Sequence, residues 1–358
     1  MKKHKALKIV FLSIGSVFLL LVAFIGGCLI FASATTLKVK DQEEMEINGN
    51  ISTKINKENE VKLLTWNMGY GALDERQDCY WDGGKGVVGE SKEIVTENVE
   101  AYKNAIKEIS PDIFLVQEAD RDSKRSYYIN EYDSLRETFT DYESTFACNF
   151  KAGVVPLPLY NMTGKVDAGI ATFSKYDLTS STRIQLPIPF SWPMKLFNLK
   201  RCLLVTRIPI ENSDKELIII NLHLEAYDDG EGKAKQLAML MDTMQEEYQK
   251  GNYVIAGGDF NQTFSTTNYQ KYPKYNDWVC PVIDASSYPS FTFKMDDTYP
   301  TCRSLSIPYK DANKDTFQYY MIDGFVVSNN ISINNLETVN LDFKNTDHNP
   351  VKMSISLN

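Results

Sequence analysis

Residues 254–261 have the sequence VIAGGDFN, an apolar run that ends in two glycines, a carboxylate and an amide. A short apolar run of this kind, bounded by glycine, predicts a buried strand. Residues i and i+2 of an extended chain point to the same side, so Asp259 and Asn261 would face one cleft at the rim of a sheet. The glycines would leave room for a ligand close to the backbone. On its own the pattern fits a turn better than an active site.

Other apolar runs end in polar residues of the same chemical kind. The predicted strands and their polar residues are 61–66 with Asn67, 113–117 with Glu118, 216–221 with His223, and 320–327 with Asp323. Helices are predicted at 95–108 and 233–250, the first ending before Pro111. A glutamate directly after a buried strand is costly unless it meets a metal, a cation or solvent. Each residue alone also fits a cap, a turn or a satisfied core group.

The histidines favour a common site. The chain has only three, and apart from His4 in the N-terminal tail they are His223 and His348. Both lie in strand-end motifs close to carboxylates, which random core positions would rarely do. The candidate set is rich in oxygen and free of cysteine: Asn67, Glu118, His223, Asp259, Asn261, Asp323, Asp347 and His348. Such ligands select Mg²⁺, Mn²⁺ or Ca²⁺ rather than zinc, and they suit metal-assisted attack of water on phosphorus.

Six short motifs, in this order, resemble the endonuclease/exonuclease/phosphatase superfamily. They are WNMG at 66–69, QE at 117–118, NLH at 221–223, GDFN at 258–261, IDGF at 322–325 and TDHNP at 346–350. The resemblance covers roughly residues 61–357. It implies an α/β fold, a four-layer α-β-β-α sandwich of two mixed sheets like that of deoxyribonuclease I, with the site at the strand ends of one edge.

The resemblance also implies roles at the metal and the water. Glu118 would hold the metal, with Asn67 and Asp347 completing its surroundings. Asp259 would orient or deprotonate the attacking water, and Asn261 would hold a phosphoryl oxygen.

The histidines would act on the phosphate. His348, oriented by Asp323, would contact the scissile group as acid or base, and His223 would contact the phosphate or the leaving group. Whether His348 or Asp259 is the base stays open. Arg121 and Arg125 follow Glu118 in a loop that is either solvated or grips phosphate.

The N-terminus predicts a membrane segment. Four lysines precede an uncharged apolar run from Ile9 to about Ala32, and about 20 such residues cross a bilayer. The basic flank would stay in the cytoplasm, which places the rest of a single-pass protein outside the cell membrane. A cleaved signal peptide ending at 32–34 is the alternative. We therefore expect a tail and anchor at 1–34, a polar linker at 35–60 and a catalytic domain at 61–358.

The charge and composition of the chain indicate which classes of substrate it could bind. The formal net charge is −9, and an acidic body disfavours avid nucleic-acid binding without excluding a local basic cleft. The proline-rich and aromatic stretch 186–199 fits either a packed loop or a lip over a substrate or against the membrane. We expect a Mg²⁺-dependent hydrolase acting on a phosphodiester or phosphomonoester of a lipid headgroup or small metabolite. The alternatives are an extracellular nuclease and a catalytically silent binding module.

Two smaller expectations complete the prediction. The sequon at 261–263 would expose a catalytic asparagine to glycosylation in a eukaryotic secretory route, which favours a bacterial source. No CxxC or Cys/His spacing suggests a cysteine metal site among the six cysteines.

Overall fold

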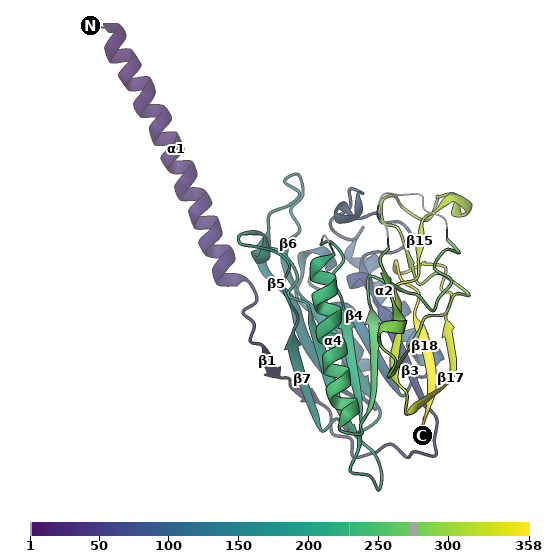
Figure 1. Cartoon of the computed structure of the whole chain (residues 1–358). Coiled ribbons are helices and arrows are strands. Elements are labelled where there is room, and N and C mark those ends of the chain that lie inside the picture. Colours follow the sequence, from purple (N-terminus) through teal and green to yellow (C-terminus); the bar gives the residue numbers. More distant parts are fainter. Residues whose placement is uncertain (1, 229, 273–277, 279) are drawn as a thin grey trace.

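Two stacked seven-stranded sheets form the body of the protein. The computed structural model describes residues 2–228, 230–272, 278 and 280–358. A long N-terminal helix, α1 (Lys2–Thr35), stands away from this body (Figure 1). The helix is apolar from Leu7 to Thr35 and exposed, as expected of either a signal peptide or a single membrane anchor.

The first sheet has, in spatial order, β1 (Gln42–Glu44), β7 (Ser180–Gln185), β8 (Cys202–Pro209), β9 (Glu216–His223), β10 (Tyr253–Asp259), β16 (Asp323–Ser328) and β13 (Phe291–Lys294). The second sheet has β17 (Ile331–Thr338), β18 (Val351–Leu357), β3 (Val61–Asn67), β4 (Ile113–Asp120), β6 (Gly164–Ser174), β5 (Glu143–Val155) and β2 (Ile47–Asn48). Two short pairs join β11 (Thr263–Phe264) to β12 (Val282–Ile283) and β14 (Cys302–Arg303) to β15 (Tyr319–Tyr320).

Helices cover the outer faces. Both sheets are mixed, because β9 runs parallel to β10 and β3 runs parallel to β4 while their other neighbours are antiparallel. Residue alternation sorts the side chains: Ile255 of β10 lies in the cluster between the sheets, and Val254 faces α4 (Glu231–Gln249). The other sheet packs against α2 (Lys92–Ile109) and α3 (Glu131–Thr138). The four-layer prediction is confirmed.

The segment 35–60, which we predicted to be a polar linker, takes part in both sheets. Its strand β1 pairs with β7, and its strand β2 pairs with β5. Ile55 is completely buried and forms a bridge with Ile210. Short edge strands need few apolar residues because one side of each faces solvent, so the polar composition concealed them.

The glycines of the VIAGGDFN strand serve packing rather than ligand approach. A Cβ at Gly258 would lie 2.0 Å from the backbone oxygen of Leu222 on β9, and the residue has a φ of +152°. A Cβ at Gly257 would lie 2.6 Å from the ring of Phe325 on β16. The strand therefore packs closely between its neighbours, and this packing fixes the position of Asp259 at the end of β10.

We expect Gly258→Ala to lower the free energy of unfolding by about 3 kcal/mol or more, because the new methyl group meets backbone that cannot move without separating β9 from β10. Urea unfolding followed by circular dichroism measures the change. Gly83→Ala is the control: Gly83 also has a positive φ, of +90°, but open space around it, so its cost should stay near 1 kcal/mol. Equal losses in the two variants would contradict the packing argument.

Candidate functional site

The first sheet brings three polar side chains to one edge. His223 ends β9, Asp259 ends β10 and Asp323 begins β16. Asp259 is the register partner of His223 on one side and of Asp323 on the other. All three side chains are buried. This edge is where the carboxyl ends of the parallel strands meet.

The second sheet supplies the facing side chains. Asn67 ends β3, and Asp347 and His348 lie in the loop before β18. Glu118 lies within β4 at an irregularity between Val116 and Ala119, with a φ of +55°. A left-handed backbone at a non-glycine residue costs about 1–3 kcal/mol and is concentrated at functional sites. The bulge turns Glu118 toward the opposite sheet.

His348 joins the two sheets. Its Nδ1 donates a hydrogen bond of 2.8 Å to Oδ2 of Asp323. Its Nε2 lies 3.7 Å from a carboxylate oxygen of Asp347 and 3.9 Å from one of Asp259. Burial alone would lower the pKa of His348, but the negative charges of Asp323 and Asp347 outweigh burial and raise it. The imidazole is thus held in one orientation and favours its protonated form, in which both ring nitrogens can donate.

Asp259 is held from two sides. The Nδ2 of Asn67 donates to Asp259 at 3.0 Å and to Glu118 at 3.1 Å, so one amide orients both carboxylates. The backbone N–H of Asn261 donates to the other oxygen of Asp259 at 2.8 Å. Burial and the charge of Asp323 raise the pKa of Asp259 to about 7. The side-chain amide of Asn261 donates to the backbone oxygen of Leu224.

His223 lies beside the same carboxylates. Its Nε2 is 3.4 Å from Asp259 and 3.9 Å from Glu118, and its Nδ1 is buried without a hydrogen-bond partner among the described residues. Burial and the nearby Arg201 lower the pKa of His223, which keeps the ring neutral. A neutral imidazole can donate, accept or ligate.

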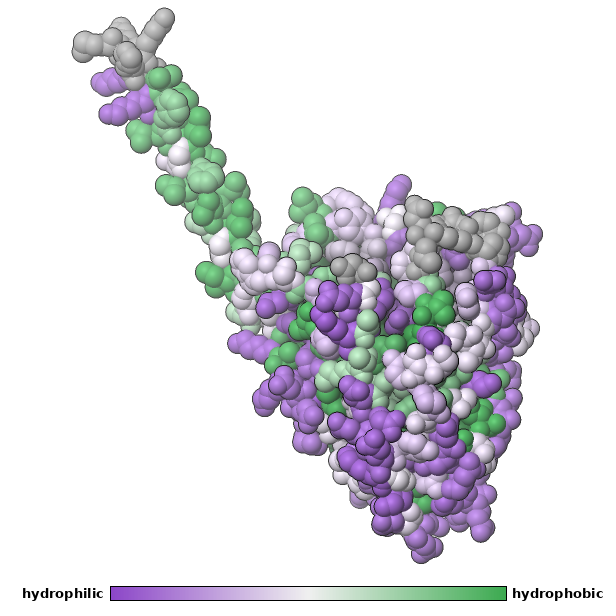
Figure 2. All heavy atoms as spheres, viewed as in Figure 1, coloured by the Kyte–Doolittle hydropathy of each residue, from purple (hydrophilic) through white to green (hydrophobic). Residues whose placement is uncertain are grey.

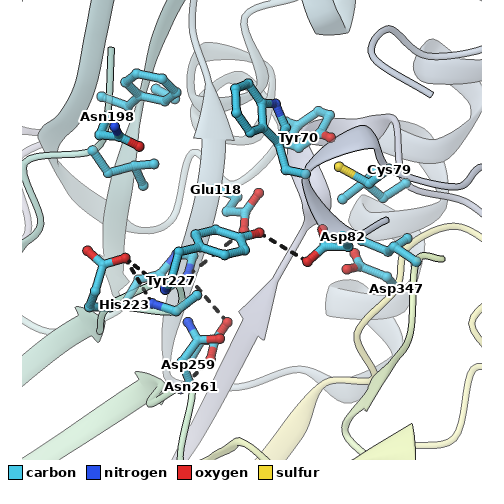
Figure 3. A pocket seen from close by; sticks show the side chains of 18 of the residues that line it. Tyr70, Cys79, Asp82, Glu118, Asn198, His223, Tyr227, Asp259, Asn261 and Asp347 are labelled. Carbon is cyan, nitrogen blue, oxygen red and sulfur yellow. Dashed lines mark hydrogen bonds and ion pairs between the residues drawn. The ribbon is translucent and has the colours of Figure 1, made fainter. Parts of the chain in front are cut away.

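A cavity of about 550 Å³ opens onto these groups (Figure 3). Its polar floor includes Glu118, His223, Asp259, Asn261, Asp347 and His348. One wall is apolar and includes Phe150, Val155, Phe190, Met194, Phe197 and Leu199. The stretch 186–199 therefore supplies part of this wall. A cavity of this size lies in the range of pockets that hold small organic ligands.

The floor fits a divalent cation. Asp259, Asp323 and His348 form one buried group whose potential ligand atoms lie within 4.8 Å of one another, and Cys302, Asp347 and His348 form another. Burial raises the pKa of the Cys302 thiol to about 12, so it stays protonated and is a poor ligand. One carboxylate oxygen of the buried Asp323 has no hydrogen-bond partner among the described residues. The hard-oxygen donors favour a divalent metal of the Mg²⁺, Mn²⁺ or Ca²⁺ kind.

The two predicted phosphate-binding arginines are placed differently. Arg125 lines the cavity, but its guanidinium pairs with Asp120 at 2.8 Å and stacks 3.6 Å from the centre of the Tyr70 ring. Arg121 is not among the cavity-lining residues and lies over the ring of Phe146. The structure thus brings only Arg125 to the candidate site.

Sequence reasoning missed a polar contact over the cavity. Tyr227 lies across the opening, and its hydroxyl donates to Asp82 at 3.1 Å (Figure 3). Asp82 comes from the 79–86 loop, whose aromatic and glycine-rich sequence was the only signal. Beneath the opening, Arg201 pairs with Glu225 at 3.3 Å and donates to the backbone oxygen of His223. Arg201 therefore positions His223.

We expect Tyr227→Phe to raise the KM for the substrate about 3- to 10-fold with little change in kcat, because the lost hydrogen bond of about 1 kcal/mol loosens the cover but touches no reacting group. Steady-state kinetics with a soluble phosphoester measures both constants. Tyr299→Phe, an equally simple change at an exposed tyrosine outside the cavity, is the control. A fall in kcat alone would show that Tyr227 acts on the chemistry instead.

Comparison with known proteins identifies the family. Residues 64–316 match the model of the Endonuclease/Exonuclease/phosphatase family. The match ends before Asp323, Asp347 and His348, which the fold nonetheless brings to the same site. No curated protein matches the chain.

Solved structures share the fold. An endonuclease/exonuclease/phosphatase from Beutenbergia cavernae is 15% identical, with a TM-score of 0.57 over 83% of this chain and 72% of that one. The human Nocturnin catalytic domain is 16% identical, with a TM-score of 0.53 over 88% and 97%. An endonuclease/exonuclease/phosphatase from Bacteroides vulgatus is 15% identical, with a TM-score of 0.52 over 84% of this chain and 100% of that one. The chain therefore belongs to the endonuclease/exonuclease/phosphatase family of metal-dependent phosphoesterases.

Proposed function

We propose that this protein is a Mg²⁺-dependent phosphohydrolase, anchored by α1 with its body outside the cytoplasmic membrane. It cleaves a phosphodiester or phosphomonoester of a lipid headgroup or a small metabolite. The observation that carries the proposal is the meeting of the His348–Asp323 pair, Asp259 and Glu118 at the floor of a cavity with an apolar wall. A floor of this kind suits hydrolysis of a phosphorus ester, and the wall suits a substrate with an apolar part.

Asp347, from the second of the two groups named above, would hold the cation together with Glu118, which lines the same cavity, and Asn67 would keep Glu118 in place through its side-chain amide. The bound cation would neutralise charge that builds on the phosphoryl oxygens. Asn67 serves Asp259 in the same way, so one residue would align the metal ligand with the group that handles water.

Asp259 would orient the attacking water and accept its proton, because burial and the charge of Asp323 raise the pKa of its carboxyl group to about 7, which suits a base near neutral pH. His348 would contact the scissile phosphate through its Nε2, because its Nδ1 is held by the hydrogen bond to Asp323. In the alternative assignment His348 takes the proton and Asp259 only orients the water. His223 would face the phosphate or the leaving group, and Asn261 would offer its amide to a phosphoryl oxygen.

A nuclease is the second candidate. Arg125 at the cavity is the observation that favours it, but that guanidinium already pairs with Asp120. The net charge of −9 and the apolar wall favour a small or lipid substrate instead.

The test is hydrolysis by the full chain in detergent, since residues 35–60 belong to both sheets. The panel holds DNA, sphingomyelin-like lipids, inositol phosphates and a chromogenic diester, each with Mg²⁺ and with chelator. We expect chelator-sensitive turnover of a lipid or small phosphoester. Strong, salt-sensitive cleavage of DNA would favour the nuclease. Failure on every substrate by a folded, Mg²⁺-binding protein would favour a silent binding module.

A further inference from the structure

Large apolar side chains are exposed on three loops around the cavity mouth. The loop between β5 and β6 exposes 82% of Leu159 and 68% of Tyr160, and the 186–199 stretch exposes 57% of Trp192. We call the following residues the apolar rim: Trp81, Leu159, Tyr160, Met162, Trp192 and Met194. Soluble surfaces rarely gather so many large apolar groups on neighbouring loops.

The three loops form one surface. The hydroxyl of Tyr160 donates to the backbone oxygen of Lys85 at 2.9 Å, which ties the β5–β6 loop to the 79–86 loop. The rings of Tyr80 and Tyr160 meet edge to face, 6.2 Å apart. Phe197, from the 186–199 stretch, packs on the apolar cluster of β5 and β6. Met194 and Trp81 also line the cavity, so the rim continues into the apolar wall.

The end of α1 is attached beside this surface. The backbone N–H of Gly153 on β5 donates to the hydroxyl of Thr35, the last residue of α1, at 3.2 Å. The chain just after α1 is held too, because the backbone N–H of Leu37 donates to the backbone oxygen of Lys151. Lys200, which follows the 186–199 stretch, donates through its ammonium group to the hydroxyl of Thr36. No slack chain separates the helix from the loops.

Figures 1 and 2 show where the apolar surface lies relative to α1. In Figure 1 the loop between β5 and β6 rises beside the C-terminal part of α1, on the side toward which the helix projects. Figure 2 shows apolar atoms at the top of the body near the helix, whereas the lower part of the body carries mostly hydrophilic residues. A bilayer crossed by α1 would therefore meet the rim.

The chemistry of the rim matches a lipid surface. Tryptophan and tyrosine favour the boundary between headgroups and acyl chains. Lys85 and Lys195 are exposed within the same loops, where they would face anionic headgroups.

We propose that the apolar rim docks into the lipid bilayer that α1 crosses, and that the cavity receives a phosphoester lipid directly from that membrane. The headgroup phosphate would reach His348 and Asp259, while Phe190, Phe197 and Val155 would contact the apolar part of the lipid. The docking rests on the rim and on the proposed anchoring by α1; the choice of substrate rests on the proposed phosphohydrolase activity.

Fluorescence quenching tests the docking without any need for activity. The full chain is reconstituted in phosphatidylcholine/phosphatidylglycerol vesicles with or without bromine on the acyl chains. The difference in emission between wild type and Trp192→Phe reports Trp192 alone. We expect this difference to be strongly quenched by the brominated lipid. An unquenched Trp192 would overturn the proposal.

Kinetics tests the substrate route. We expect Leu159→Asp to lower kcat/KM toward a phospholipid in vesicles about 10-fold. This factor corresponds to the loss of the favourable transfer of one leucine side chain from water into lipid. Its activity toward the soluble chromogenic diester should not change. Val282→Asp, at another exposed apolar residue, should affect neither substrate. Equal losses on both substrates in Leu159→Asp would contradict docking. Quenched Trp192 without turnover of any lipid would keep the docking and refute the substrate.

Discussion

Replacing His348 by alanine is expected to lower kcat/KM toward the phosphoester substrate by about 10²- to 10⁴-fold, the usual contribution of a general acid or base. The imidazole lies near Asp259, Asp347 and Asp323 at once, so its removal affects all three carboxylates. The measurement is steady-state hydrolysis with saturating metal, alongside circular dichroism to show that the fold persists.

Asp323→Asn separates orientation from chemistry. The amide keeps the shape of the side chain but removes the negative charge that holds the proton on Nδ1 of His348. We expect a smaller loss than in His348→Ala, and no added loss in the double variant because the two residues act as one unit. Additive losses would show that Asp323 has a separate task.

Glu118→Gln is expected to weaken activation by Mg²⁺ about 100-fold or more, because the amide removes a charged oxygen ligand from the cavity floor. The measurement is the metal concentration that gives half-maximal rate, together with calorimetric binding of Mg²⁺ to the full chain. Adding chelator to the wild type should give the same loss and be reversed by excess metal.

Glu137→Gln is the matched control for this change. Glu137 lies exposed on α3, away from the residues that line the cavity. Glu137→Gln removes one negative charge, as Glu118→Gln does, but away from the cavity. The metal dependence of this variant should therefore equal that of the wild type. Unchanged metal affinity in Glu118→Gln would remove Glu118 from the ligand set and leave Asp347 as the principal carboxylate.

The strand-end motifs predicted the candidate site residues because each motif joins a buried strand to a polar residue, and the family resemblance that the motifs carry supplied the four-layer fold. Two register relations, from Asp259 to His223 and from Asp259 to Asp323, then bring separate motifs together. Short or half-exposed strands carry no such signal, and β1, β2, β7 and β17 (Ile331–Thr338) were not predicted. The position of Glu118 on a bulge with left-handed backbone also has no local signature.

The cover of the cavity was unpredictable for a different reason. Tyr227 and Asp82 are 145 residues apart, and each lies in a loop without regular periodicity. The same holds for Arg201 and Glu225, whose pairing depends on the turn after β9. Long-range contacts between loops follow from the finished fold, whereas the strands that support them follow from local pattern.

Because the hydrogen bond between His348 and Asp323 spans the two sheets, the geometry of the candidate site depends on how the sheets are positioned relative to each other. Asp323 begins β16 of the first sheet, whereas His348 lies in the loop before β18 of the second. Between the sheets lies a core that includes Leu63, Leu115 and Ile255. A smaller side chain in that core would lower the free energy of unfolding by about 1 kcal/mol or more, and any shift of one sheet against the other would also change the geometry for proton transfer. Selection on turnover would therefore constrain residues far from the cavity, and losses of activity there need no loss of folding.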